Sequence, residues 1–162
     1  MSTDSVYYAQ VSRNPKAFKG PGTLTLYLES PEDTKEVGRY AVITGGGQLD
    51  DKKLGGLTPK LHWKMLEEID ERDHPHTNVG IMTMSRIVPE LEEDRDEYPN
   101  RTFGWEGSND WPFMIHIAGG SSGCIAIMPK HWHAAKEALN AAFRHSQEND
   151  YTFTIEVFDQ DD

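Results

Sequence analysis

The residues best suited to catalysis lie close together, between a histidine at position 116 and the single cysteine at position 124. Alternation over residues 113–117 predicts a strand, residues 119–123 are rich in glycine and serine, and residues 124–127 predict a second strand. We expect adjacent strands joined by a tight turn, which place His116 and Cys124 near one another at one end of a sheet. A free thiol has a pKa of about 8.5, and an imidazolium partner lowers it so that thiolate exists at neutral pH.

The glycine-rich turn predicts a site for an oxyanion. Glycine adopts backbone conformations that are closed to other residues, so the amides of Gly123 and Cys124 can point at an oxyanion. We expect Ser121 to shape the turn and contact substrate, with Ser122 as a further candidate. Four more residues are candidates for lining a substrate cleft: Gly119, Gly120, Trp105 and Trp111. Packing in a core or loop is the alternative role of both tryptophans.

A structural interpretation of the same residues is a hairpin with a buried cysteine and a hydrogen-bonded histidine. The position of His116 argues against it, because Phe113, Ile115 and Ile117 share the opposite, apolar face of the strand. The group that orients the imidazole cannot be named, since a backbone carbonyl in that role leaves no trace in a sequence.

The string IHIAGGSSGCIAI, from Ile115 to Ile127, resembles the catalytic signature of the L,D-transpeptidases, the YkuD-type catalytic domain. Those enzymes have a strand ending in Ile-His, a loop, and Ser-x-Gly-Cys followed by an apolar strand. His116 matches the first half, and Ser121, Gly123 and Cys124 match the second. The short loop and the missing signal peptide are more similar to the small L,D-transpeptidase-like effectors of type VI secretion systems, which attack peptidoglycan in rival bacteria.

The resemblance implies a cysteine acyltransferase that requires no metal and no organic cofactor. The Cys124 thiolate attacks the stem-peptide carbonyl before D-alanine, and His116 acts as base and then as acid toward the leaving D-alanine. An amine resolves the thioester in transpeptidation or D-amino-acid exchange, and water resolves it in an L,D-carboxypeptidase. Such an antibacterial toxin is made in the cytoplasm without a signal peptide and exported to the periplasm of a target cell. Its partners are the peptidoglycan stem peptide and an immunity protein or secretion component.

Two other kinds of site remain open. Residues 119–123 fit the Gly-x-Ser-x-Gly elbow with Ser121 as nucleophile, a pattern that needs a strand before it and a helix after it. A zinc site is the second alternative, although no recognised metal spacing is present. Its candidate ligands are His74, His76 and His116, or His131 and His133.

Composition excludes several classes of protein. The chain has 162 residues with 16 Lys+Arg and 27 Asp+Glu, and its net charge of −11 argues against a broad nucleic-acid-binding surface. No apolar run approaches the roughly 18 residues of a membrane span. The charge also supports a non-enzymatic alternative, an acidic binding or inhibitor protein of a secretion or phage system in which Cys124 is structural.

The remaining pattern predicts a single β-rich α+β domain with mostly antiparallel sheets. Residues 1–22 are expected to form an N-terminal arm or irregular element, and residues 23–162 the catalytic domain. Strands are expected at 23–28 and 38–44, as a hairpin, and at 79–88, 113–117, 124–127 and 151–158. A middle helix is expected from Thr58 to Ile69, an exposed acidic loop or short helix at 90–97, and a C-terminal helix from Pro129 to about His145.

Overall fold

The computed structural model describes residues 5–45, 58–73, 80–97, 113–118 and 125–160. Strands dominate these ranges and one α-helix follows near the C-terminus, which confirms the predicted β-rich α+β class. The strands are β1 (Val6–Arg13), β2 (Pro21–Glu29), β3 (Thr34–Ile43), β4 (His62–Met65), β5 (Asp70–Asp73), β6 (Ile81–Pro89), β7 (Phe113–Ile117), β8 (Ile125–Ile127) and β9 (Thr154–Asp159). The helices are α1 (Trp132–Glu148) and the 3-10 turns η1 (Glu92–Glu97) and η2 (Pro129–His131).

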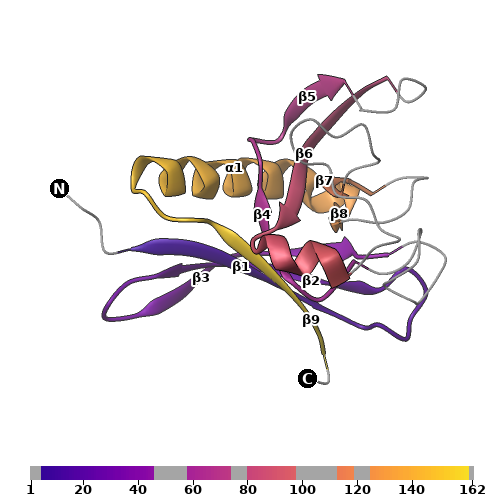
Figure 1. Cartoon of the computed structure of the whole chain (residues 1–162), viewed down its shortest axis with the longest axis horizontal. Coiled ribbons are helices and arrows are strands. Elements are labelled where there is room, and N and C mark those ends of the chain that lie inside the picture. The colour runs from indigo at the N-terminus through magenta and orange to yellow at the C-terminus, as the bar shows by residue number, and fades with distance from the viewer. Residues whose placement is uncertain (1–4, 46–57, 74–79, 98–112, 119–124, 161–162) are drawn as a thin grey trace.

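The described strands form one sheet that closes on itself. Its order is β4-β9-β1-β2-β3-β8-β7-β6-β5, and β4 also pairs with β6, so the strands from β4 to β6 in this order make a ring. β5 lies outside the ring, along β6. Most pairs are antiparallel, as predicted, and β1–β9 and β7–β8 are parallel. In Figure 1, β1, β2, β3 and β9 form a layer beneath α1, and β5 and β6 rise away from it.

The predicted hairpin over residues 23–44 is confirmed. β2 and β3 pair antiparallel from Pro21 opposite Ile43 to Glu29 opposite Thr34. Leu24 and Leu26 of β2 are buried in the core, as the alternating leucines of this segment predict.

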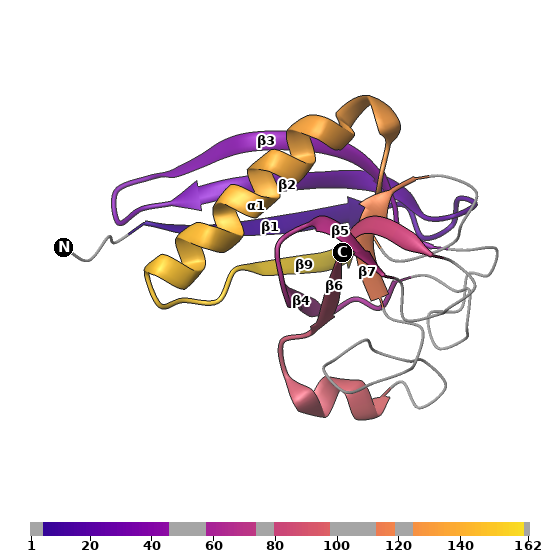
Figure 2. The same ribbon diagram turned by 90° about the horizontal axis from the view of Figure 1, so that it is seen from above.

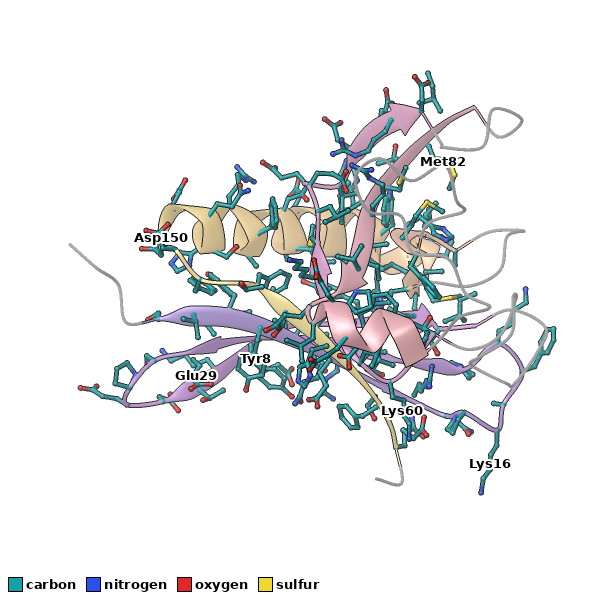
Figure 3. The ribbon with its side chains drawn as sticks, in the orientation of Figure 1. Tyr8, Lys16, Glu29, Lys60, Met82 and Asp150 are labelled. Atoms are coloured by element: carbon teal, nitrogen blue, oxygen red, sulfur yellow. The ribbon has the colours of Figure 1, made fainter. Side chains whose placement is uncertain are left out.

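Residues 6–13 form a regular strand, so the prediction of an arm or irregular element is wrong for this stretch. β1 lies between β2 and β9 in the sheet. Ala9 and Val11 are buried in the core, whereas Tyr8 and Gln10 alternate with them. Figure 3 shows Tyr8 on the side of the sheet away from α1. Polar residues such as Gln10 lie on that outer face and alternate with the buried ones.

The middle helix predicted for residues 58–69 is also wrong. β4 lies within this part of the chain and β5 begins directly after it, and both run antiparallel to β6. Trp63 and Met65, two residues apart, are buried in the core. The other edge of β4 pairs with β9. Because both edges of β4 find strand partners, tertiary hydrogen bonding outweighs the local helical spacing of the apolar residues.

A break between β4 and β5 is bridged by side chains. The amide of Ile69 donates to Oδ1 of Asn140 at 2.6 Å, and Nδ2 of Asn140 donates to the carbonyl of Ile69 at 3.0 Å. The amide of Arg86 donates to the Glu67 carboxylate at 2.7 Å, and the two side chains form an ion pair. These contacts satisfy backbone groups that strand pairing would otherwise satisfy.

The C-terminal helix is confirmed, with its end three residues later than predicted, at Glu148 instead of His145. Figure 2 shows α1 lying across β1, β2 and β3. Its buried face includes Ala135, Leu139 and Phe143, which join the core. Asp150, at the end of the helix in Figure 3, has a φ of 56°, and this left-handed conformation turns the chain toward β9.

The acidic run forms the short 3-10 helix η1, in agreement with the predicted exposed loop or short helix. None of the helices in the described ranges is long and apolar enough to cross a membrane.

Candidate functional site

The strands β7 and β8, which carry the two halves of the predicted motif, are neighbours. They pair in parallel, with His116 opposite Ala126. The adjacency of the strands is confirmed, but the hairpin geometry is wrong. The first residue of β8, Ile125, lies opposite Ile115, two residues before the end of β7 at Ile117.

The strand β7 is buried on both faces as far as His116. Phe113 faces the core, where its ring centroid lies 4.9 Å from that of Trp63. Met114 and His116 face the opposite side and are 3% and 1% exposed. The position of His116 opposite the main apolar stripe is confirmed. Because this second face is also buried, the position does not argue against a structural histidine.

The described residues paired with His116 across the sheet are apolar. Met84 of β6 lies opposite it on one side and Ala126 of β8 on the other, and both are buried. In such an environment the charged imidazolium loses hydration without gaining a counter-ion. Burial accordingly lowers the pKa of His116 below 6.5, and the hydrogen bond to the Ile117 carbonyl opposes this shift without reversing it.

The hydrogen bond of His116 determines which ring nitrogen carries the proton. Nδ1 lies 2.7 Å from the carbonyl oxygen of Ile117. A carbonyl oxygen only accepts hydrogen bonds, so Nδ1 is the donor, and Nε2 of the neutral ring holds the free lone pair. No partner for Nε2 occurs among the described residues. Burial thus favours the neutral imidazole with its proton on Nδ1, and within the described ranges Nε2 keeps a free lone pair.

The structure supplies one partner that the sequence could not identify. The Ile117 carbonyl orients the imidazole, and it is a backbone group with no signature in residue type. The burial of the Met114 and His116 face was also missed. Alternation between apolar and mixed residues predicts a strand with one buried face. Burial of the other face depends on the elements that pack against it, which the sequence of the strand does not show.

Charged side chains lie on the same face one strand away. Arg86 is opposite Met114 in the register of β6 and β7, and its guanidinium pairs with Glu67 at 2.7 Å. Nε of Arg72 donates to the carbonyl of Met84 at 3.1 Å. Arg86 is on β6, the strand that pairs with β7, and Arg72 is on β5, beside β6. Both guanidinium groups are bonded to described partners.

Most of the predicted site residues lie outside the described ranges, so their positions carry no argument. They are Cys124, Gly119, Gly120, Ser121, Ser122, Gly123, Trp105 and Trp111. The described part of the predicted site consists of His116 and the strands on either side of the turn.

The elbow alternative is weakened by the element that follows the turn. A nucleophile elbow requires a helix directly after the serine turn. Here the chain continues into the strand β8.

The zinc alternatives also gain no support from geometry. Nδ1 of His131 accepts a hydrogen bond from the amide of Ala41 at 2.8 Å, and His133 is exposed on α1. His74 and His76 are outside the described residues. In the part of the chain that the structure describes, no three His, Cys, Asp or Glu side chains are grouped to hold a metal ion.

Comparison of the whole chain with protein-family models, with curated proteins and with solved structures gives no match to any of them. The resemblance to L,D-transpeptidases therefore rests on the motif of residues 113–127.

Proposed function

We propose that this chain is a cysteine acyltransferase of the L,D-transpeptidase type that acts on peptidoglycan stem peptides. The observation that carries the proposal is the state of His116. Burial favours its neutral form, its Nδ1 is held by the Ile117 carbonyl, and its Nε2 has no hydrogen-bond partner among the described residues. His116 lies on β7, and the neighbouring strand β8 begins at the residue that follows Cys124 in the chain.

The proposed first step forms a thioester. The thiol of Cys124 gives its proton to Nε2 of His116 while the sulfur attacks the carbonyl carbon that precedes D-alanine. The amides of Gly123 and Cys124 stabilise the oxyanion. The carbon–nitrogen bond then breaks, and Nε2 returns the proton to the leaving amine of D-alanine.

The second step releases the acyl group. An acceptor amine or a water molecule gives a proton to Nε2 and attacks the thioester carbon. The carbon–sulfur bond breaks, and the thiolate recovers the proton from His116. An amine yields a crosslink or an exchanged amino acid, and water yields the shortened stem peptide. A neutral resting imidazole suits both steps, because each begins with the removal of a proton.

The test is the reaction of purified protein with a disaccharide tetrapeptide ending in D-alanine. Intact-mass analysis should show loss of D-alanine from the substrate and a thioester adduct on the wild type. Cys124→Ala should abolish both, and His116→Gln should lower turnover by about 10²–10⁴-fold. His133→Gln, which removes an exposed histidine of α1, is the matched control and should leave turnover unchanged.

Thiol reactivity separates this proposal from its alternative. Iodoacetamide should label Cys124 quickly in the wild type and more slowly in His116→Gln, because that variant lacks the base that takes the thiol proton as the sulfur attacks. Absence of D-alanine release from folded protein, together with slow labelling, would overturn the acyltransferase proposal.

A second candidate function is an acidic, non-enzymatic binding or inhibitor protein of a secretion or phage system. The 1% exposure of His116 favours it, since a buried imidazole with a satisfied Nδ1 also suits a purely structural role. The net charge of −11 would then serve a basic partner. This candidate predicts an unreactive thiol and salt-sensitive capture of a basic protein.

The cellular setting is part of the same proposal. As an antibacterial effector, the enzyme would act in the periplasm of a target cell, and the producing cell would need an immunity protein. Expression of the wild-type chain in the periplasm should lyse cells that lack such a protein. Expression of Cys124→Ala in the same way should not.

A further inference from the structure

A cavity of about 240 Å³ lies at the C-terminal half of α1, away from the strand that carries His116. It is bordered by β4, by the last turns of α1 and by the segment that leads into β9. Its apolar floor includes Met65, Phe143 and Phe153, which are 4%, 9% and 2% exposed. These side chains belong to the main core, so the floor is fixed by the fold.

Two of the polar side chains that line this cavity already form hydrogen bonds within the protein. The Ser146 hydroxyl donates to the carbonyl of Phe143 at 2.6 Å. The Tyr151 hydroxyl accepts from the amide of Tyr7 at 2.9 Å and lies 2.8 Å from Nδ1 of His145. These two groups are thus committed to the protein itself.

Lys64, Gln147 and Thr152 also line the cavity. Among the described residues, Lys64 has no ion-pair partner, and its neighbours across the sheet are Val88 and Thr154, which carry no charge. Gln147 and Thr152 are exposed and supply amide and hydroxyl donors.

Several other cations of the described residues have carboxylate partners, whereas Lys64 has none among them. Lys60 and Arg13 share Asp159, Arg86 pairs with Glu67, and Arg144 pairs with Glu68. A second cavity of about 270 Å³ on the same helix is lined by Arg144, whose charge is therefore compensated. The Lys64 cavity thus joins an apolar floor to a lysine that has no ion-pair partner in the described part of the chain.

We propose that the Lys64 cavity binds a small carboxylate that has a branched or ring-shaped apolar body. The carboxylate accepts hydrogen bonds from the ammonium group of Lys64 and from Gln147 or Thr152 at the rim. The apolar body covers Met65, Phe143 and Phe153. The volume of about 240 Å³ is on the order of what a small organic acid of roughly ten non-hydrogen atoms occupies. This inference does not depend on the proposed acyltransferase function.

The test is a titration of the full chain with 4-methylpentanoate and 3-phenylpropanoate, followed by two-dimensional NMR and calorimetry. We expect saturable shifts of resonances from Met65, Phe143 and Phe153 with a Kd of about 1 mM. The uncharged 4-methylpentanamide, which has the same shape as the first acid, should bind at least about tenfold more weakly because it offers Lys64 no charge.

Two lysine variants isolate the charge. Lys64→Gln should weaken carboxylate binding at least about tenfold, and Lys136→Gln, which removes another lysine of similar partial exposure on α1, should not. Circular dichroism and unchanged thermal unfolding establish that Lys64→Gln is folded, and Thr152→Trp, which fills the mouth, provides an independent block. Equal affinity for acid and amide, equal effects of the two lysine variants, or no saturable shift up to about 20 mM would each overturn the proposal.

Discussion

At the scale of the residue, His116 shows how burial and one hydrogen bond together set a protonation state. Burial favours the neutral ring, and the Ile117 carbonyl selects the tautomer with the proton on Nδ1. A solvent-exposed histidine would be partly charged near pH 6.5 and would have no fixed tautomer. The same two features define both the proposed general base and the structural alternative, so reactivity at Cys124 is the deciding property.

The lowered pKa of His116 predicts a loss of stability in mild acid. The unfolded chain binds a proton at His116 near pH 6.5, whereas the folded chain binds it only at lower pH. Between these values the unfolded state holds more protons, so the free energy of unfolding falls as pH drops below about 6.5. Urea unfolding at pH 7.5 and pH 5.0 should show a larger loss for the wild type than for His116→Gln. Equal losses in the two proteins would show that His116 titrates normally in the fold.

Arg13 is a second residue whose burial has a measurable consequence. Its side chain is 2% exposed, its Nε donates to Asp159 at 3.0 Å, and its guanidinium also donates to the carbonyl of Thr58. Burial alone would raise the pKa of Asp159, but hydrogen bonds and charges from Arg13 and Lys60 outweigh it and lower that pKa.

Removal of the Arg13 charge should therefore be costly. Arg13→Met should lower the free energy of unfolding by about 3 kcal/mol, because Thr58 and Asp159 lose a buried charged donor. Lys16→Met, which removes an exposed cation from the following loop, should change it by less than about 0.5 kcal/mol. The stability from the Arg13–Asp159 pair is present above pH 4 and is lost as pH falls through the lowered pKa of Asp159. An Arg13→Met cost below about 1 kcal/mol would contradict this account.

At the scale of the element, the break between β4 and β5 depends on a helix residue. Asn140 of α1 exchanges two hydrogen bonds with the backbone of Ile69, in the way that a neighbouring strand would. This contact joins the helix to the sheet at the point where the pairing with β6 changes from β4 to β5. It also explains a polar residue, 9% exposed, on the buried face of an amphipathic helix.

Asn140→Ala should destabilise the protein by about 2–3 kcal/mol, since it leaves the amide and carbonyl of Ile69 buried without their partners. Hydrogen exchange at the Ile69 amide should accelerate more than exchange at amides in the middle of β1. Glu137→Ala, on the exposed side of the same helix, should cost less than about 0.5 kcal/mol. A similar effect of the two substitutions would show that helix propensity, and not the contact with Ile69, determines the loss.

At the scale of the whole molecule, the ring of strands joins both ends of the chain. β1 pairs with β9 in parallel, and β9 in turn pairs with β4, which pairs with β6. The first and last strands are therefore central to the sheet, and the ring closes through contacts between segments that lie far apart in the sequence. Pairing between such distant segments has a high contact order, so we expect slow folding.

Deletion of residues 1–13 should prevent folding, because β2 and β9 would lose the strand between them. Circular dichroism should show no cooperative thermal transition for the truncated chain. Gln10→Ala, which keeps β1 and changes only its outer face, is the control and should retain most of the stability. A truncated protein that unfolds cooperatively near the wild-type temperature would mean that β1 is dispensable.

Local pattern was sufficient for the hairpin of β2 and β3, the strands β6 and β7, and the helix α1. The leucines of β2 and the buried face of α1 recur at the period of their own secondary structure, and β6 and β7 are short runs rich in apolar residues, so local side-chain spacing and composition carry the signal. The histidine and cysteine that the proposed chemistry requires also stand close together in the sequence, and their catalytic role stays a prediction.

Tertiary structure decided the features that depend on distant partners. β4 is a strand because β6 and β9 pair with both its edges, which overrides its helical spacing. β1 is central because β9 returns to it from the other end of the chain. His116 is buried and neutral because Met84 and Ala126 flank it across the sheet, and its tautomer is set by a backbone carbonyl. Sequence periodicity reports the environment of one segment along its own axis, whereas these properties arise from hydrogen bonds and burial contributed by other segments.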